Sequence, residues 1–475
     1  MIHSTNNSST FFDAIADGRM RSQKRHRYYW NEITNYCNFF SHNSLSILEV
    51  GCGTGELLNS IKGKKKTGID FSAKMIDIAQ SSFPDISFHV MPAENIALNE
   101  KYDLIILSNL IGYIDDIQIV FEQLHQVCHE RTKIIVTYYN HLWEPSLKLG
   151  EFFRLKIKTS NQNWLTKNDI KNLLMLSGFE VYRESRRMIF PVYIPLLSEF
   201  LNNFLAKLPL IRQLSINSYS FAQVKPFLTN EQVVNKYSVS IVIPARNESG
   251  NIENAIKRMP AFGRFQEIIF VEGHSTDDTW EKIKEVKNKY LDTHRIKIAR
   301  QDGIGKNDAV RKGFSMAEGE ILMILDADLT VSPEDLPKFY FAIASGKADF
   351  VNGSRLVYQM EKEAMRYLNM LGNKFFSLAF SWLLDQPFKD TLCGTKVMLR
   401  KEYENMNQNR EYFGNFDPFG DFDLIFGAYK LNLRIVELPV RYHERTYGST
   451  NISRIKHGFL LLRMCFFALR KIKLK

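Results

Sequence analysis

The 475-residue sequence has only five cysteines, and no two of them stand as a CxxC pair. Scattered cysteines of odd number argue against a disulfide framework and against a structural zinc site, and they fit a reducing compartment. The first ten residues are polar and have no apolar core, so a secretory signal is not expected. The expectation is a cytoplasmic protein.

Long uncharged apolar runs are also missing, which argues against an ordinary membrane-spanning helix. Two segments come closest to one. Residues 189–211 are interrupted by three prolines, Glu199 and Lys207, and residues 458–469 are short and contain Arg463. We therefore expect no spanning helix in this chain.

An excess of positive charge is present, but it is confined to one end. Residues 441–475 hold nine Lys or Arg and one acid, so they carry +8 of the net charge of +10. A uniformly basic chain would indicate nucleic acid, which is not expected here. A basic tail beside apolar residues such as Phe459 and Phe466 favours an anionic membrane surface or a phosphorylated acceptor, and a solvated helix with basic ends is the alternative.

The composition, with 45% hydrophobic and 24% charged residues, is that of a globular protein, and the length favours two or three domains. In both halves, short apolar runs alternate with helical stretches, which predicts βαβ units and a mostly parallel sheet. The runs are 46–50, 66–69, 87–91, 104–107 and 133–138, then 239–243, 267–271, 295–299, 321–325 and 350–352. The predicted class is α/β, with domains at 1–214 and 237–457, a linker at 215–236 and a basic amphipathic helix at 458–475.

A glycine-rich turn follows the first predicted strand. The strand ends in Glu49, and the turn contains Gly51, Gly53 and Gly55. Glycines allow a tight turn and a close approach of the backbone to a ligand. The next strand ends at Asp70, where an acid can accept hydrogen bonds from both hydroxyls of a ribose. Glu49 would repel a pyrophosphate, but it suits a ligand with a positive centre.

This pattern resembles the class I S-adenosylmethionine-dependent methyltransferases, over residues 44–138. The resemblance implies a Rossmann-like domain and S-adenosylmethionine as cofactor. The residues implied in cofactor binding are Glu49, Gly51, Gly53, Gly55, Asp70, Met75, Glu94 and Asn109. Glu94 is included because Pro92 stands where the family often has an acid for the adenine amine, and a backbone group is the alternative there.

The methyl acceptor is not apparent from the sequence. Tyr113, Tyr139 and His141 are candidates for a general base, but packing or a position at the rim explains each of them equally well. The simplest alternative for this half is a doubly wound domain whose glycine turn only packs a helix on a sheet.

The second half carries two acids, Asp326 and Asp328, directly after its most apolar run. Carboxylates at i and i+2 beyond a buried strand are costly unless a cation satisfies them. Oxygen ligands at this spacing suit Mg²⁺ or Mn²⁺ holding a substrate diphosphate, whose leaving charge the metal would offset.

Together with the segments after the neighbouring strands, these acids resemble the family 2 glycosyltransferases, with the GT-A fold, over residues 237–470. The resemblance implies a nucleotide-sugar site made of Pro244, Ala245, Asn247, Glu248, Glu272, Lys306, Asp326 and Ala327, with the metal on Asp326 and Asp328. The later motifs, with Arg355 and Arg445 at the phosphates, are similar to the polyprenyl-phosphate branch, which includes the dolichyl-phosphate mannose synthases. That branch commonly has Ser-Lys where Thr450-Asn451 stands here.

Two further acids, Asp421 and Asp423, open a predicted helix. In family members that act on hydroxyl acceptors, an acid in this region is the general base, whereas a phosphate acceptor is already ionised and needs none. A helix cap or first-turn acid is the alternative role.

The sequence thus predicts a bifunctional transferase of cell-envelope glycan synthesis. One domain transfers methyl groups, and Asp328 and the metal of the other serve inverting glycosyl transfer from a nucleotide-sugar to a lipid-phosphate or glycan acceptor. Two alternatives stay open: a glycan-extending enzyme that uses Asp421 as base, and a chain in which one domain only binds or recruits.

Overall fold

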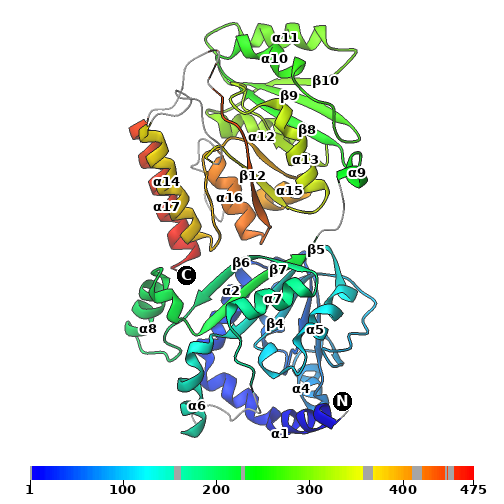
Figure 1. The fold of residues 1–475 in the computed structure, drawn as a ribbon, viewed down its shortest axis with the longest axis vertical. Coiled ribbons are helices and arrows are strands. Elements are labelled where there is room, and N and C mark those ends of the chain that lie inside the picture. Colours follow the sequence, from blue (N-terminus) through cyan, green and yellow to red (C-terminus); the bar gives the residue numbers. More distant parts are fainter. Residues whose placement is uncertain are drawn as a thin grey trace. The chain divides into compact units, whose positions relative to one another are not determined.

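The computed structural model describes residues 3–153, 162–225, 230–356, 367–408, 420–443, 445, 447 and 454–474. The chain forms two compact units that divide between Lys225 and Pro226, and each unit contains one seven-stranded sheet (Figure 1). The predicted α/β class with two domains is confirmed.

The first unit contains strands and helices in alternation. Its strands are β1 (Ser46–Val50), β2 (Lys65–Asp70), β3 (Ser87–Val90), β4 (Tyr102–Ser108), β5 (Cys128–Tyr139), β6 (Phe179–Arg187) and β7 (Asn217–Val224). Its helices include α1 (His3–Arg25), α2 (Arg27–Phe39), α3 (Glu56–Ser60), α4 (Ala73–Ser82), α5 (Ile117–Gln123), α6 (Glu144–Phe152), α7 (Lys167–Leu176) and α8 (Leu197–Glu199).

The first sheet has the strand order β3-β2-β1-β4-β5-β7-β6. The first five strands are parallel, and β7 runs antiparallel between β5 and β6. From β1 the chain proceeds outward through β2 to β3, and it then returns to the other side of β1 with β4. Connections that diverge in this way leave a crevice at the carboxyl ends of β1 and β4, where open α/β sheets bind their ligands.

Helices cover both faces of this sheet because the strands are apolar on both sides. On one face, Val120 and Phe121 of α5 and Ile170 and Leu174 of α7 join a buried cluster with β1, β4 and β5. On the other face, the Tyr36 ring of α2 lies 4.7 Å from the ring of Tyr219 in β7.

The second unit contains β8 (Val239–Ala245), β9 (Gln266–Glu272), β10 (Arg295–Arg300), β11 (Ile321–Ile324), β12 (Phe350–Ser354), β13 (Lys396–Leu399) and β14 (Ile435–Pro439). Its helices are α9 (Asn230–Val233), α10 (Ser249–Lys257), α11 (Thr279–Lys289), α12 (Lys306–Met316), α13 (Leu336–Ala344), α14 (Tyr367–Leu383), α15 (Arg400–Gln408), α16 (Asp421–Lys430) and α17 (Arg454–Ile472). The strand order is β10-β9-β8-β11-β13-β12-β14.

The connections of the second sheet diverge at β8 and β11. These strands and β9 and β10 are parallel, whereas β13 is antiparallel to both of its neighbours. The segment after β8 and the segment after β11 therefore emerge side by side at the switch point. The amino end of β13 reaches the same edge, because Met323 in β11 is paired with Val397.

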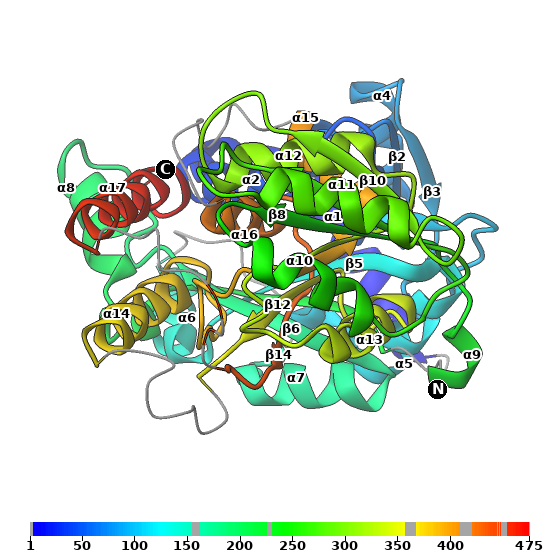
Figure 2. The same cartoon turned by 90° about the horizontal axis from the view of Figure 1, so that it is seen from above.

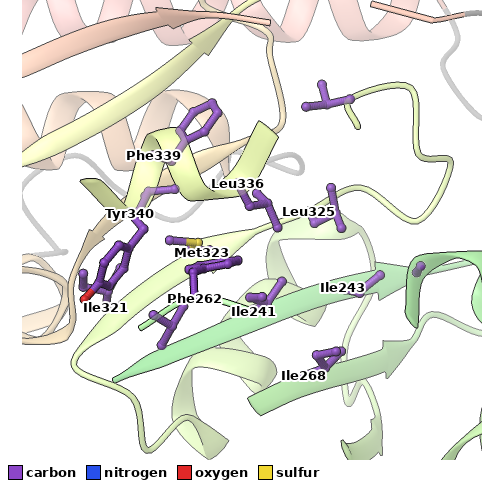
Figure 3. Packing of buried hydrophobic residues seen from close by; sticks show 14 of the residues in the cluster. Ile241, Ile243, Phe262, Ile268, Ile321, Met323, Leu325, Leu336, Phe339 and Tyr340 are labelled. Carbon is purple, nitrogen blue, oxygen red and sulfur yellow. The ribbon is translucent and has the colours of Figure 1, made fainter. Parts of the chain in front are cut away.

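The core of the second unit lies on one face of its sheet. Ile241, Ile243, Ile321, Met323 and Leu325 alternate along β8, β11 and the residue after it, and α13 packs on them through buried residues such as Phe339 (Figure 3). Seen from above, α12 lies on one side of β8, and α10 and α13 lie on the other (Figure 2).

The boundary between the units differs from the linker predicted at 215–236. Residues 217–224 form β7, which is buried along almost its whole length although it contains Asn217, three more polar residues and no long apolar run. Both neighbours of β7 are strands, so its backbone is satisfied. Lys133 Nζ donates to the Gln223 side chain at 2.6 Å, whereas the Asn217 amide has no hydrogen-bond partner among the described residues. The polar sequence of this segment therefore did not indicate an interior strand. The helix predicted at 458–475 lies within α17 and the residues after it.

Candidate functional sites

The glycine turn after β1 is held to the end of β2 by the side chain of Asp70. The Gly53 N–H donates to Asp70 Oδ2 at 2.9 Å, and the Ser72 N–H donates to Oδ1 at 3.0 Å. Gly51 and Gly55 have φ values of 74° and 83°, in the left-handed region that favours glycine. Burial raises the pKa of Asp70, and the two backbone donors oppose that rise.

Glu49 is a buried acid at the end of β1. Burial, together with the charges of Glu56 and Asp70, raises the pKa of its carboxyl well above the usual range. Among the described residues, its Oε2 atom has no hydrogen-bond partner. A buried carboxyl oxygen without a partner is costly, so a cationic ligand group would be stabilised beside it.

The crevice is lined further by Asn109, after β4. Its backbone has a φ of 52°, and its Nδ2 donates to the Tyr29 hydroxyl at 3.0 Å, while Oδ1 has no partner among the described residues. Tyr29 in turn is hydrogen-bonded to Tyr139. Burial raises the pKa of Tyr139 to about 12, so this phenol is not ionised near neutral pH.

Two other predicted cofactor residues, Met75 and Glu94, and one candidate base, His141, lie in segments that follow β2, β3 and β5. Met75 is buried in the first turn of α4, where its N–H donates to Ser72 Oγ at 3.2 Å. Glu94 is half-buried in the loop after β3. His141 lies in a short 3-10 turn after β5.

Helix α1 borders the same crevice, a position that no sequence pattern indicated. Asp13 Oδ1 accepts from Ser72 Oγ at 2.5 Å and from the Lys74 N–H at 3.3 Å. The Phe12 ring packs edge-on against Phe71 and against Tyr113, with centroids 5.3 and 5.6 Å away. Nothing in the local sequence indicates these contacts, which join residues between 59 and 101 positions apart.

The second unit brings four predicted residues into two ion pairs at the switch point. Lys306 Nζ lies 2.6 Å from Asp326 Oδ1, and Arg445 Nη2 lies 2.5 Å from Asp328 Oδ2. Burial raises the pKa of Asp326, but Lys306 and the other cations nearby together bring the pKa below its ordinary value. The carboxyl therefore stays ionised. Thr330 also donates to Asp328, through its hydroxyl at 2.9 Å. Ala327 is buried between the two acids.

Arg445 reaches this position because the chain after β14 runs along the segment that follows Asp328. Val331 and Tyr442 form an antiparallel bridge, and the His443 N–H donates to the Thr330 carbonyl at 3.0 Å. Arg445 Nη1 also lies 2.7 Å from Glu248 Oε1, so one guanidinium joins the loops after β8 and β11. Burial raises the pKa of Glu248 to about 7, although Arg445 lowers it.

The remaining nucleotide-side residues tie the β8 loop to the β9 loop. Asn247, with a φ of 55°, donates from its N–H to Ser275 Oγ at 3.0 Å and accepts from the Thr276 N–H at 2.8 Å. Glu272 Oε1 accepts from the Ser275 N–H at 2.5 Å. Pro244 and Ala245 are the last two residues of β8.

Arg355 is fastened to a buried acid. Its Nε and Nη2 donate to the two carboxylate oxygens of Asp390 at 2.7 and 2.9 Å. Burial raises the pKa of Asp390, but Arg355 lowers it to about 2. Arg355 therefore contributes positive charge near Asp326 from a fixed position.

Asp423 faces a different environment from the two acids of the switch point. Burial raises its pKa to about 6, and Arg311, whose Nη2 lies 3.8 Å away, opposes that rise. It lines a cavity with Tyr403 and Met406, between α12, α15 and α16. The Asp421 side chain lies outside the described residues, as does Glu444. The roles of Asp421 and Asp423 stay predictions.

Metal binding at the switch point would rest on two carboxylates. The described part of the chain contains no group of three or more His, Cys, Asp or Glu side chains that could hold a metal ion. Asp326 and Asp328 nevertheless fit Mg²⁺ or Mn²⁺, because such ions are often held by one or two carboxylates together with substrate phosphates.

Comparisons with known proteins agree with this division. A family model described as a methyltransferase domain matches residues 20–184, and the model of glycosyl transferase family 2 matches residues 240–405. The chain therefore carries a methyltransferase domain followed by a family 2 glycosyl transferase domain, and both predicted resemblances are confirmed.

None of the helices in the described residues is long and apolar enough to cross a membrane.

The curated relatives cover less than half of this chain. A dolichol-phosphate mannosyltransferase from Pyrococcus furiosus is 30% identical over 219 residues, which cover 45% of this chain and 59% of the relative. An undecaprenyl-phosphate 4-deoxy-4-formamido-L-arabinose transferase from Proteus mirabilis is 28% identical over 225 residues, or 46% of this chain and 64% of the relative. The chain thus spans about three fifths of the length of these relatives.

Among solved structures, a SAM-dependent methyltransferase from Thermotoga maritima is similar over 45% of this chain and 98% of its own, with 16% identity and a TM-score of 0.36.

Proposed function

We propose that the chain is a bifunctional transferase. The first unit transfers a methyl group from S-adenosylmethionine, and the second transfers a sugar from a nucleotide-sugar to a lipid phosphate. The observation that carries the proposal is the pair of switch points at the carboxyl edges of the two sheets. The first gathers acids and backbone N–H donors, and the second gathers acids and cations from separate loops.

In the glycosyl transferase unit, a bound Mg²⁺ or Mn²⁺ would neutralise charge on the leaving diphosphate. Asp326 and Asp328 are the residues that would hold the ion. Lys306 and Arg445 now pair with these acids at 2.6 and 2.5 Å. Lys306 and Arg445 would supply positive charge for the substrate phosphates, since Lys and Arg donate charge-assisted hydrogen bonds to phosphate as well as to carboxylate.

The acceptor attacks the anomeric carbon from the face opposite the leaving group, so a new oxygen–carbon bond forms as the bond to the diphosphate breaks. We favour a lipid phosphate as acceptor for two reasons. The relatives are named for dolichol-phosphate and undecaprenyl-phosphate. In addition, Asp423 pairs with Arg311 and not with a residue of the switch point. An ionised phosphate acceptor needs no base of this kind.

A lipid acceptor requires access to a membrane, and two neighbouring helices offer a surface for it. Helices α14 and α17 lie side by side (Figure 1). On α17, Phe459, Leu462 and Phe466 are exposed, and on α14, Phe375 and Leu378 are exposed. Arg463 and Arg470 are exposed on α17 as well. Apolar and basic side chains on one surface are typical of peripheral binding to anionic lipid.

In the methyltransferase unit, S-adenosylmethionine would supply the methyl group on a sulfonium. Glu49 is the residue for its cationic amino group, Asp70 for the ribose hydroxyls, and Gly51, Gly53 and Gly55 for close backbone contact. Asn109 and Tyr29 border the acceptor side of the crevice. Displacement at a methyl group depends mainly on positioning, which these buried residues supply.

The glycosyl transferase proposal is tested by calorimetry and donor turnover with UDP-, GDP- and dTDP-sugars, with Mg²⁺ or Mn²⁺ and a polyprenyl phosphate in detergent. We expect one donor to be used in a metal-dependent reaction that Asp328→Asn abolishes. Asp421→Asn and Asp423→Asn separate the acceptors: turnover within a few fold of wild type supports a phosphate, and its loss supports a hydroxyl acceptor. Failure of every donor to bind would refute the proposal.

The methyltransferase proposal is tested by calorimetry with S-adenosylmethionine. Wild type and the distant control Lys148→Met should bind it, and Glu49→Gln and Asp70→Ala should bind it at least tenfold more weakly. Equal binding by all four proteins would show that the ligand occupies a different site.

A further inference from the structure

The connection between β6 and β7 is far longer than two antiparallel neighbours need, since such strands are commonly joined by a turn of a few residues. Residues 188–216 instead form an excursion with its own turns. It contains α8, followed by η4 (Phe200–Phe204), η5 (Leu205–Lys207) and η6 (Ile211–Leu214), and α8 is labelled in Figure 1. The segment includes one of the two longest apolar runs of the sequence.

Many apolar side chains of this excursion point outward, although Met188, Ala206 and Ile216 are buried. Leu196 is 82% exposed and Leu210 is 85% exposed. Eight other large apolar residues of the segment are also exposed: Val192, Tyr193, Ile194, Leu197, Phe200, Phe204, Leu208 and Leu214. Soluble monomers rarely expose contiguous apolar surface of this kind unless it binds something.

Two polar side chains of the same excursion, Asn202 and Ser198, point inward, whereas Glu199 is exposed. Asn202 Oδ1 accepts from the Ile189 and Phe190 N–H groups, both at 2.9 Å, and its Nδ2 donates to the Phe190 carbonyl at 2.7 Å. Ser198 Oγ accepts from the Ile194 N–H at 2.6 Å. Both side chains are buried. These two buried polar side chains thus satisfy backbone groups of the segment itself, and its exposed surface is formed largely by apolar side chains.

Leu196 adds an independent indication. Its φ is 63°, in the left-handed region that a leucine rarely adopts. Backbone strain of this kind persists only where the surrounding structure enforces it, and it clusters at functional positions. Here the left-handed backbone occurs at a leucine that is among the most exposed of the described residues.

The chemistry of the surroundings favours lipid as the occupant. Residues 189–214 contain one acid, Glu199, and the cations Lys207 and Arg212. The neighbouring turn is joined to the excursion by Trp143, whose Nε1 donates to the Leu214 carbonyl at 2.7 Å. That turn leads into α6, whose Phe152 is exposed. Lys207 is buried and Arg212 is half-buried, so the exposed surface here is mainly apolar and aromatic. Protruding apolar side chains with aromatic neighbours are typical of segments that lie in the membrane interface.

We propose that residues 188–216 dock the methyltransferase unit on a lipid bilayer, with Leu196 and Leu210 inserted at the boundary between headgroups and acyl chains. This surface belongs to a different unit from the one that contains α17, and it requires neither enzymatic activity. The methyltransferase would then work on an acceptor at a membrane, which is a narrower substrate class than its family indicates.

Flotation of the full chain with vesicles tests the proposal. The vesicles are pure phosphatidylcholine, in 0.5 M salt, so that electrostatic binding through α17 is suppressed. The test variant is Leu196→Asp/Leu210→Asp, in which aspartate tolerates the left-handed backbone at 196. The control is Met175→Asp/Leu176→Asp, which changes two residues of α7 that are 56% and 58% exposed on the same unit.

We expect wild type and control to float with the vesicles, and the test variant to partition at least tenfold less. Leu196→Asn/Leu210→Asn should lose binding as well, because the loss arises from insertion and not from repulsion. All four proteins should unfold at similar temperatures, since the changed residues are exposed.

Equal flotation of test variant and control would overturn the proposal. The proposal would also be overturned if the wild type fails to float and is a dimer by light scattering while the test variant is a monomer. The surface would then join two copies of the chain. A wild type that binds in low salt only, and loses binding in Phe459→Asp/Phe466→Asp, would assign membrane contact to α17 alone.

Discussion

Glu248 links the charge balance of the glycosyl transferase site to pH. Burial raises its pKa to about 7 from an ordinary value of 4.5, although Arg445 lies 2.7 Å away. Between these two values the folded chain binds more protons than the unfolded chain. The stability that the protonated group contributes is therefore complete below about pH 4.5 and is lost as the pH rises through about 7.

Glu248→Gln should remove this dependence. Between pH 5 and 7.5, we expect the unfolding temperature of the second unit to fall by a few degrees more in wild type than in the variant, since about 1 kcal/mol corresponds to some 2–4 °C in a domain of this size. Scanning calorimetry across that range measures the difference. Parallel curves for the two proteins would contradict the assigned pKa.

Gly394 lies against the ion pair of Asp326 and Lys306. A Cβ atom there would fall well inside van der Waals contact of both side chains. Gly394→Ala should therefore displace the pair and lower glycosyl transfer by about a hundredfold, as misplacement of catalytic groups by about 1 Å can do.

Gly372→Ala is the matched control for that variant, because a Cβ at Gly372 meets no atom within 4 Å. It should leave turnover unchanged and stabilise α14 by up to about 1 kcal/mol, since alanine favours a helix interior over glycine. Steady-state turnover and thermal unfolding of both variants decide the matter. Full activity in Gly394→Ala would show that the pair is not needed.

At the scale of elements, the end of α17 is anchored by an ion pair in the interior. Lys473 Nζ lies 2.7 Å from Asp385 Oδ1, and the two side chains are only 4% and 1% exposed. Lys473→Met leaves a buried carboxylate without its cation, which typically costs about 3–5 kcal/mol. Denaturant unfolding of the full chain should detect this loss in the transition of the second unit.

Two further variants show whether the loss arises from the unpaired charge. Lys473→Met/Asp385→Leu, which removes both charges, should recover most of the stability, because an apolar pair of similar volume often replaces a buried ion pair without cost. Lys338→Met removes an exposed partner of Asp335 and should change stability by no more than about 1 kcal/mol. A small effect of Lys473→Met would mean that α17 is held by its apolar face alone.

At the scale of the whole molecule, each unit has a core of its own. The buried cluster around β8 and β11 draws only on residues 233–440, and the cluster around β1 and β4 draws only on residues 48–224. Cooperative unfolding follows contacts within a core, so we expect two transitions in calorimetry.

These transitions should respond separately. S-adenosylmethionine should raise only the transition of the first unit, by mass action, and Asp70→Ala should lower only that one. Lys473→Met should lower only the other. A single transition that every change shifts would show that the two units unfold as one.

Much of this organisation is predictable from local pattern. Apolar runs interrupted by helical stretches predicted ten strands in two sheets, and the glycine turn and the paired acids after buried strands predicted where both sites lie. Such signals are local, because a strand or a turn depends on the residues within it. The strands β6, β7, β13 and β14 were not predicted. β7 in particular has a polar sequence that becomes interior only because strands flank it on both sides.

The sequence by itself determined the two α/β domains, their families and the chemical types of residue at each switch point. Only the tertiary structure decided which of these residues meet. Arg445 reaches Glu248 across 197 positions and Asp328 across 117. Asp13 reaches Ser72 from another helix, and Asn202 turns inward while Leu196 faces out. Such contacts depend on the path of the chain through space, and that path is set by packing of whole elements, for which no short stretch of sequence carries a signal.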